Sequence, residues 1–132
     1  MKHLISPHQR MIIYKKSKMR CSMCGTKDNL TCDHFIPRWT RIVGNDTKNL
    51  IPLCYDCNNN VKGDTFVELN TLTYLDSYYI VELMLFYKDI RLYLKKYIRD
   101  FGKYRTNNSL DIDRALLVLK SYDAYLDKHG LL

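Results

Sequence analysis

Two Cys-x-x-Cys pairs constrain this chain more than any other feature of its sequence. Cys21 and Cys24 form the first pair, and Cys54 and Cys57 form the second. Two thiolates at this spacing bind one side of a tetrahedral Zn²⁺, and a second pair completes the coordination. Because four sulfurs leave no position for water, such a zinc is structural, and any catalytic metal must bind elsewhere. We therefore expect the chemistry to lie between the two pairs.

Length and cysteine usage favour one small domain, or a zinc-stapled module with a helical extension. The 132 residues, 46% of them hydrophobic, can fill a core. Paired cysteines without a recognisable signal peptide favour zinc over disulfides, so we expect an intracellular, cytoplasmic protein. No uncharged stretch is long enough for a membrane span, and we expect no membrane partner.

The net charge of +7 is concentrated in the first half of the chain. Residues 1–64 carry 11 Lys and Arg against 5 Asp and Glu, whereas residues 65–132 carry 10 against 9. A basic surface attracts polyanions, because each neutralised phosphate releases condensed counterions. Nucleic acid is therefore the leading partner. The basic residues before the first cysteine pair are interpreted as a solvated face, and they are Lys15, Lys16, Lys18 and Arg20.

The first half of the chain predicts short elements around the cysteines. Ser6-Pro7-His8-Gln9 is a helix start with a capping box. Short strands are expected over residues 30–35 and 50–53. A helix is expected from Cys54 to about Val61, with Gly63 closing it.

The second half predicts a helical hairpin. Residues 77–101 carry apolar side chains at alternating spacings of three and four, and residues 110–128 repeat the pattern. This seam needs burial against the other helix or against a second copy, so a homodimer through these helices stays open. The opposite edge of the longer helix is basic and could follow phosphates; it contains Lys88, Arg91, Lys95, Lys96 and Arg99.

Three motifs between and around the cysteine pairs together resemble the HNH endonuclease family. They are Asp33-His34-x-x-Pro37, Asn49-Leu50-x-x-Leu53-Cys54 and Cys57-Asn58, with Lys62-Gly63-Asp64 after them. The resemblance implies an α+β fold, a small zinc-stapled ββα-metal core with flanking α-helices. The expected organisation is an N-terminal helix and basic linker (1–20), the nuclease core (21–64) and a C-terminal helical extension (65–132).

The resemblance also implies an activity and the residues that carry it. It implies DNA cleavage with a divalent metal, Mg²⁺ or Mn²⁺, leaving 5′-phosphate and 3′-hydroxyl ends. His34 would be the general base, Asp33 and Asn58 the ligands of the catalytic metal, and Asn49 the residue that fixes the loop carrying His34. These residue types suit the chemistry, because carboxylate and amide oxygens bind hard cations and imidazole accepts protons near neutral pH.

Several assignments stay open at this point. Counting forward from Cys57 selects Asn58, but counting three residues back from Lys62 selects Asn59; we favour Asn58. Nucleic-acid contacts are expected from Arg38, Trp39, Arg41 and Lys62, although a packed Trp39 is an equal alternative. The alternative function is a zinc-knuckle nucleic-acid-binding module without cleavage. DNA specificity, nicking versus double-strand cutting and the biological programme, such as a phage or mobile-element origin, are not encoded in these motifs.

Overall fold

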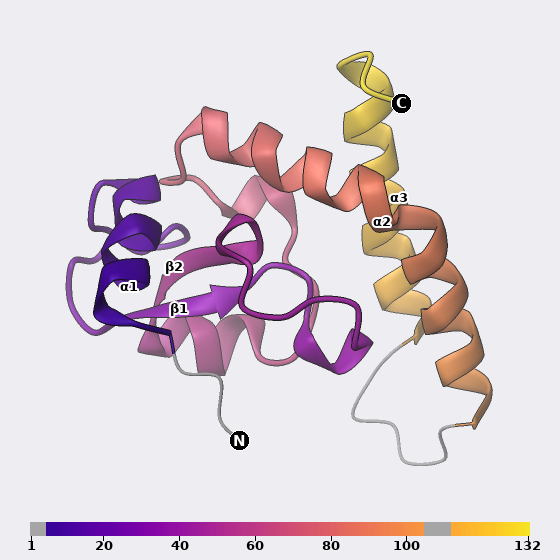
Figure 1. The fold of residues 1–132 in the computed structure, drawn as a ribbon, viewed down its shortest axis with the longest axis horizontal. Helices are drawn as coiled ribbons and strands as arrows, with labels where there is room; N and C mark the ends of the chain where they lie inside the picture. The colour runs from indigo at the N-terminus through magenta and orange to yellow at the C-terminus, as the bar shows by residue number, and fades with distance from the viewer. Residues whose placement is uncertain (1–4, 105–111) are drawn as a thin grey trace.

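The computed structural model describes residues 5–104 and 112–132, which form a two-stranded sheet surrounded by helices (Figure 1). Helix α1 (Pro7–Tyr14) lies at one side of the sheet. The long helix α2 (Ser77–Tyr104) passes along the sheet and then runs beside α3 (Ile112–Lys128). The mixed α+β fold class is therefore confirmed, whereas the division into three segments stays a prediction. Among the described helices, none is long and apolar enough to cross a membrane.

Helix α1 begins as its sequence predicts and ends in a short 3-10 turn, Lys15–Ser17. The Ser6 hydroxyl accepts a hydrogen bond from the Gln9 backbone, and the Gln9 side chain accepts one from the Ser6 backbone. This capping box satisfies donors that a helix start otherwise leaves unpaired.

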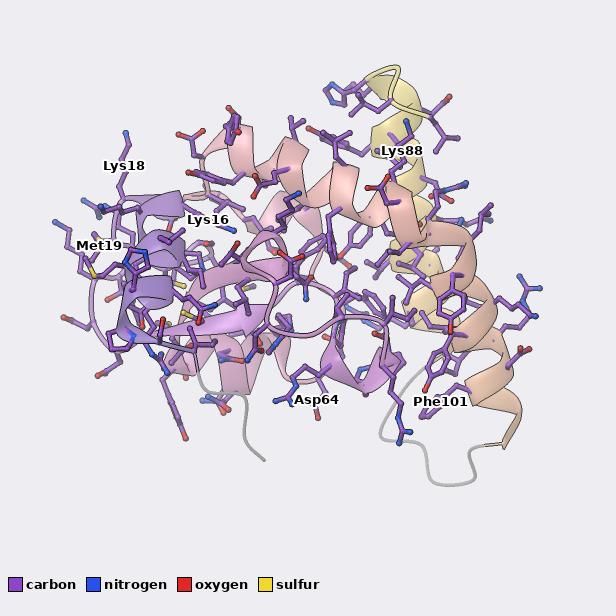
Figure 2. The ribbon with its side chains drawn as sticks, in the orientation of Figure 1. Lys16, Lys18, Met19, Asp64, Lys88 and Phe101 are labelled. Carbon is purple, nitrogen blue, oxygen red and sulfur yellow. The ribbon has the colours of Figure 1, made fainter. Side chains whose placement is uncertain are left out.

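Lys16, at the end of this region, does not belong to a solvated face. Its side chain is buried, and its ammonium donates to the backbone carbonyls of Thr47 and, at 2.9 Å, Leu50. Lys18 is exposed and points outward, whereas Lys16 points into the molecule (Figure 2). The prediction of a wholly solvated basic approach was therefore wrong for Lys16.

The sheet consists of β1 (Leu30–His34) and β2 (Leu50–Cys54), which pair antiparallel. In this register Asp33 lies opposite Ile51, and His34 lies opposite Leu50. Every residue of β2 is buried, so β1 is held against a fixed inner strand. The Asp-His pair therefore sits at the end of a supported strand.

The segment after β2 differs from the predicted α-helix. Cys57–Lys62 forms a π-helix, and the Gly63 N–H donates to the Asn58 carbonyl at 2.9 Å. Hydrogen bonds to the fifth preceding residue close a loop one residue longer than that of an α-helix, which widens the turn. Gly63 ends the turn with φ of 59°, a conformation that glycine adopts without steric cost.

Helices α2 and α3 pack against one another and share one hydrophobic core with the sheet. Leu83, Tyr87 and Leu94 of the predicted seam are buried. Tyr122 of α3 stacks on Phe35, which follows β1, with ring centroids 5.2 Å apart. The extension therefore supports the sheet directly.

Part of the basic edge of α2 binds α3 instead of facing solvent. Arg91 Nε lies 2.9 Å from Asp123 Oδ1, and the Lys95 ammonium pairs with the other oxygen of the same carboxylate. Neighbouring cations hold the pKa of Asp123 at about 2, against the opposing effect of its burial. Two of the five residues expected to follow phosphates are thus engaged within the hairpin.

Candidate active site beside a four-cysteine cluster

The four paired cysteines converge in the structure. Their Sγ atoms all lie within 4.8 Å of one another. Within each pair, the backbone N–H of the second cysteine faces the sulfur of the first, at 3.5 Å for Cys24 and 3.3 Å for Cys57. Four soft sulfur donors at this separation fit Zn²⁺, and they fill its tetrahedral coordination. The cluster is therefore compatible with the predicted structural zinc.

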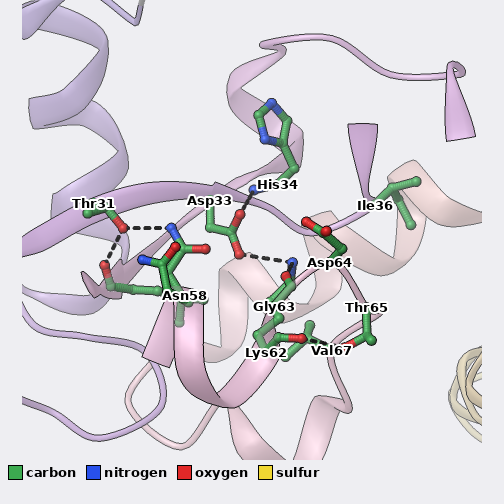
Figure 3. Close-up of polar contacts among 12 residues, drawn as sticks. Thr31, Asp33, His34, Ile36, Asn58, Lys62, Gly63, Asp64, Thr65 and Val67 are labelled. Atoms are coloured by element: carbon green, nitrogen blue, oxygen red, sulfur yellow. Dashed lines mark hydrogen bonds and ion pairs between the residues drawn. The ribbon is translucent and has the colours of Figure 1, made fainter. Parts of the chain in front are cut away.

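A separate cleft of about 540 Å³ lies beside the end of β1. It brings residues from β1, the following turn and the π-helix to one place (Figure 3). Its lining consists of Asp33, His34, Pro37, Arg38, Trp39, Asn58, Asn59, Lys62, Gly63 and Asp64.

Asp33 lines this cleft, and its two carboxylate oxygens have different partners. Its Oδ1 accepts a hydrogen bond from the His34 backbone at 2.8 Å, and its Oδ2 lies 2.9 Å from the Lys62 ammonium (Figure 3). The direction of the second contact is not that of a hydrogen bond, and Oδ2 has no hydrogen-bond partner among the described residues. Asp33 is therefore a largely buried carboxylate whose Oδ2 atom is itself buried and is held mainly by the charge of Lys62.

His34 is half-buried, and its ring orientation is fixed from one side. Its Nε2 lies 2.9 Å from the side-chain oxygen of Asn45. Burial lowers the pKa of the imidazole; the Asn45 contact and the Asp33 charge oppose this effect, and Arg38 and Lys62 reinforce it. A lowered pKa favours the neutral ring, which is the form that accepts a proton.

Asn49 holds the backbone that follows His34. Its side-chain oxygen accepts from the Ile36 N–H at 2.7 Å, and its side-chain nitrogen donates to the Ile36 carbonyl at 3.1 Å. The Phe35 N–H also donates to the Asn49 carbonyl at 2.7 Å. Asn49 is completely buried. This geometry is what a loop-fixing residue requires, although its part in catalysis stays a prediction.

The two candidate asparagines of the π-helix occupy different environments. Asn58 is half-buried, and its side-chain nitrogen donates to Thr31 Oγ1 on β1 at 3.0 Å. Asn59 is exposed and donates to the Tyr55 carbonyl within its own helical segment. Because only Asn58 is tied to the strand that carries Asp33, the geometry favours it as the ligand.

The predicted nucleic-acid contacts are distributed unevenly. Arg38 is exposed at the cleft, whereas Arg41 is exposed outside the cleft lining. Trp39 packs edge-on against Phe66 and stacks on Phe101, at centroid distances of 5.8 and 5.7 Å. Its indole N–H donates to the Asp64 carbonyl. Trp39 therefore connects the core to α2, and base stacking by its ring stays a prediction.

Two residues of this site were missed by sequence reasoning. Thr31 supports Asn58 and in turn donates to the Leu53 carbonyl at 2.8 Å. Asn45 contacts His34 from a loop eleven residues later. Alternation on β1 places Thr31 on the same face as Asp33, so it could have been found. Asn45 lies in an irregular loop and gives no comparable signal.

The oxygen donors of the cleft fit a hard divalent cation. Asp33 offers a carboxylate, and Asn58 offers an amide oxygen while its nitrogen holds Thr31. Mg²⁺ and Mn²⁺ are commonly bound through one or two carboxylates plus other oxygens.

Comparison with known proteins identifies the segment that contains this cleft. Residues 21–64 match the family model described as HNH endonuclease. No curated protein and no solved structure matches the chain. The resemblance drawn from the motifs is therefore confirmed over these residues. Since members of this family are generally nucleases, the match supports a nuclease-type function with a metal site.

Proposed function

We propose that this protein is an endonuclease that hydrolyses DNA phosphodiester bonds with a divalent metal. The observation that carries the proposal is the convergence of His34, Asp33 and Asn58 on one cleft in the basic half of the chain. The expected products carry 5′-phosphate and 3′-hydroxyl ends.

Each residue of the cleft has a distinct part in this reaction. When Nε2 of His34 donates to Asn45, Nδ1 keeps its lone pair and can take the proton of an attacking water. Asp33 and Asn58 would hold Mg²⁺ or Mn²⁺, which stabilises negative charge on the phosphate and the leaving oxygen. Arg38 supplies positive charge at the mouth of the cleft.

A plasmid-cleavage assay tests this proposal. Supercoiled DNA incubated with the zinc-loaded protein should be cut when Mg²⁺ or Mn²⁺ is added and remain intact when no further divalent cation is added. The alternative is a zinc-knuckle module that binds nucleic acid without cleaving it. Such a module would shift the DNA in a gel under all these conditions and leave the plasmid intact.

The choice between Asn58 and Asn59 gives a prediction about the metal site. Asn58→Ala should lower cleavage about a hundredfold, because losing a ligand misplaces the metal. Asn58→His should keep much of the activity, since imidazole can ligate the same cations. Asn59→Ala is the matched control and should change little. Initial cleavage rates at saturating Mn²⁺ measure all three, and the reverse pattern would assign the ligand to Asn59.

The contact between Asn45 and His34 gives a second prediction. Asn45→Ala should lower the cleavage rate constant about tenfold with KM nearly unchanged, because the ring loses its fixed orientation while the DNA surface stays intact. Asn60→Ala is the matched control, since Asn60 is exposed and donates to Asp56. Rates measured over a range of DNA concentrations separate the two constants. A rise in KM alone would place Asn45 in DNA binding instead.

The apolar seam that a homodimer would bury is already covered within one chain. Tyr122 and Leu126 of α3 are buried with the seam of α2, so one chain can satisfy both helices. Dimerisation therefore stays a prediction that light scattering of the purified protein can check.

A further inference from the structure

Lys62 is buried and paired with a carboxylate, whereas a lysine that only binds phosphate needs neither feature. Only 3% of its side chain is exposed, and its ammonium lies 2.9 Å from Asp33 Oδ2. The Gly63 carbonyl lies 3.5 Å from the same nitrogen. Burying an ammonium this far from water costs free energy unless a carboxylate pairs with it. Lys62 and Asp33 therefore neutralise one another in the cleft.

The π-helix produces this arrangement through two parallel contacts with β1. Thr31 and Asp33 occupy alternate positions of β1 and thus share one face. Asn58 reaches Thr31, and Lys62, near the other end of the same turn, reaches Asp33 (Figure 3). The π-helix therefore points both Asn58, a candidate metal ligand, and the Lys62 ammonium toward the strand that carries Asp33.

We propose that Lys62 and the catalytic divalent metal compete for Asp33, and that metal binding releases Lys62 to contact a DNA phosphate. This inference rests on the proposed function. A divalent cation at Asp33 repels an ammonium that lies 2.9 Å from one oxygen of the same carboxylate, so each cation weakens the binding of the other. The displaced ammonium would still line the cleft, where a phosphodiester is the anion that can replace Asp33.

Metal titration of the zinc-loaded 132-residue protein without DNA tests the competition. Lys62→Met should lower the dissociation constant for Mn²⁺ about tenfold, since one adjacent charge changes the proton affinity of a carboxylate by at least that factor. Lys62→Arg keeps the charge and should stay within about threefold of the wild type. Calorimetry or the electron paramagnetic resonance signal of free Mn²⁺ gives these constants. An unchanged or weaker Mn²⁺ affinity in Lys62→Met would overturn the proposal.

Two controls make this result specific. Arg38→Met also removes one positive charge from the cleft, but Arg38 is exposed and should change the Mn²⁺ constant less than twofold. Lys62→Gln has a polar side chain without charge and should shift the constant in the same direction as Lys62→Met if the latter folds poorly. Circular dichroism and zinc content establish which variants are folded.

DNA binding tests the release of the ammonium. With Ca²⁺ as a divalent cation, Lys62→Met should weaken binding to a labelled duplex about threefold or more, whereas without any added divalent cation the two zinc-loaded proteins should bind equally. An equal loss in both conditions would mean that Lys62 contacts phosphate without competition. Failure of the wild type to bind Mn²⁺ or to cleave DNA would remove the proposed function itself. A wild type that does both, with Lys62→Met unchanged, would remove only this inference.

Discussion

His34→Ala should lower plasmid cleavage by about 10²- to 10⁴-fold, the range typical of losing a positioned general base. His34 lies at the end of β1 with one ring nitrogen on Asn45, so its loss removes the proton acceptor without disturbing the strand. Zinc content, Mn²⁺ affinity and duplex binding should stay close to those of the wild type. Initial rates of supercoiled plasmid loss at fixed pH measure the effect.

Two comparisons distinguish a lost base from a damaged cleft. His8→Ala is a matched control, because His8 is exposed on α1 away from the cleft lining and should cleave normally. Asp33→Ala should lose Mn²⁺ binding as well as cleavage, since Asp33 is the carboxylate proposed to hold the metal. Normal cleavage by His34→Ala would show that another group activates the water.

Features whose causes lie within a few residues could be predicted from the sequence. The capping box depends only on Ser6 and Gln9. Gly25 directly follows the first cysteine pair and adopts φ of 80°, a left-handed conformation that glycine reaches without steric cost. The four-cysteine cluster follows from the spacing of the cysteines, because the ligands of one metal must converge whatever path the intervening chain takes. The strands follow from the residues of the two short segments themselves.

Features whose causes lie in distant parts of the chain could not be predicted from the sequence. Lys16 has a charge pattern typical of a solvated residue, but its ammonium satisfies carbonyls more than thirty residues away. Asn45 acquires a role only because its loop lies against His34. Trp39 is packed by Phe66 and Phe101, and the latter lies on a helix outside the motif. Local pattern cannot reveal partners that only tertiary packing supplies.

The other large effect concerns zinc, whose removal should unfold the nuclease core. The first cysteine pair is joined to β2 by a hydrogen bond from the Ser22 N–H to the Pro52 carbonyl, and the second pair begins where β2 ends. A zinc ion in this cluster would thus tie together both ends of the segment that carries the cleft. Structural zinc in small domains contributes on the order of 10 kcal/mol, comparable with the whole stability of a domain.

Chelation with EDTA or a stronger zinc ligand, followed by circular dichroism, should therefore show loss of folded structure and of all cleavage, with recovery when Zn²⁺ is restored. Cys21→Ser should behave like the chelated protein, because it removes a sulfur from the cluster. Cys32→Ser is the matched control: Cys32 lies on β1 outside the four-cysteine cluster, so its substitution should leave zinc content at one per chain. Folded wild-type protein without zinc by elemental analysis would contradict the prediction. The stability of the fold would then have to come from the core shared with α2 and α3.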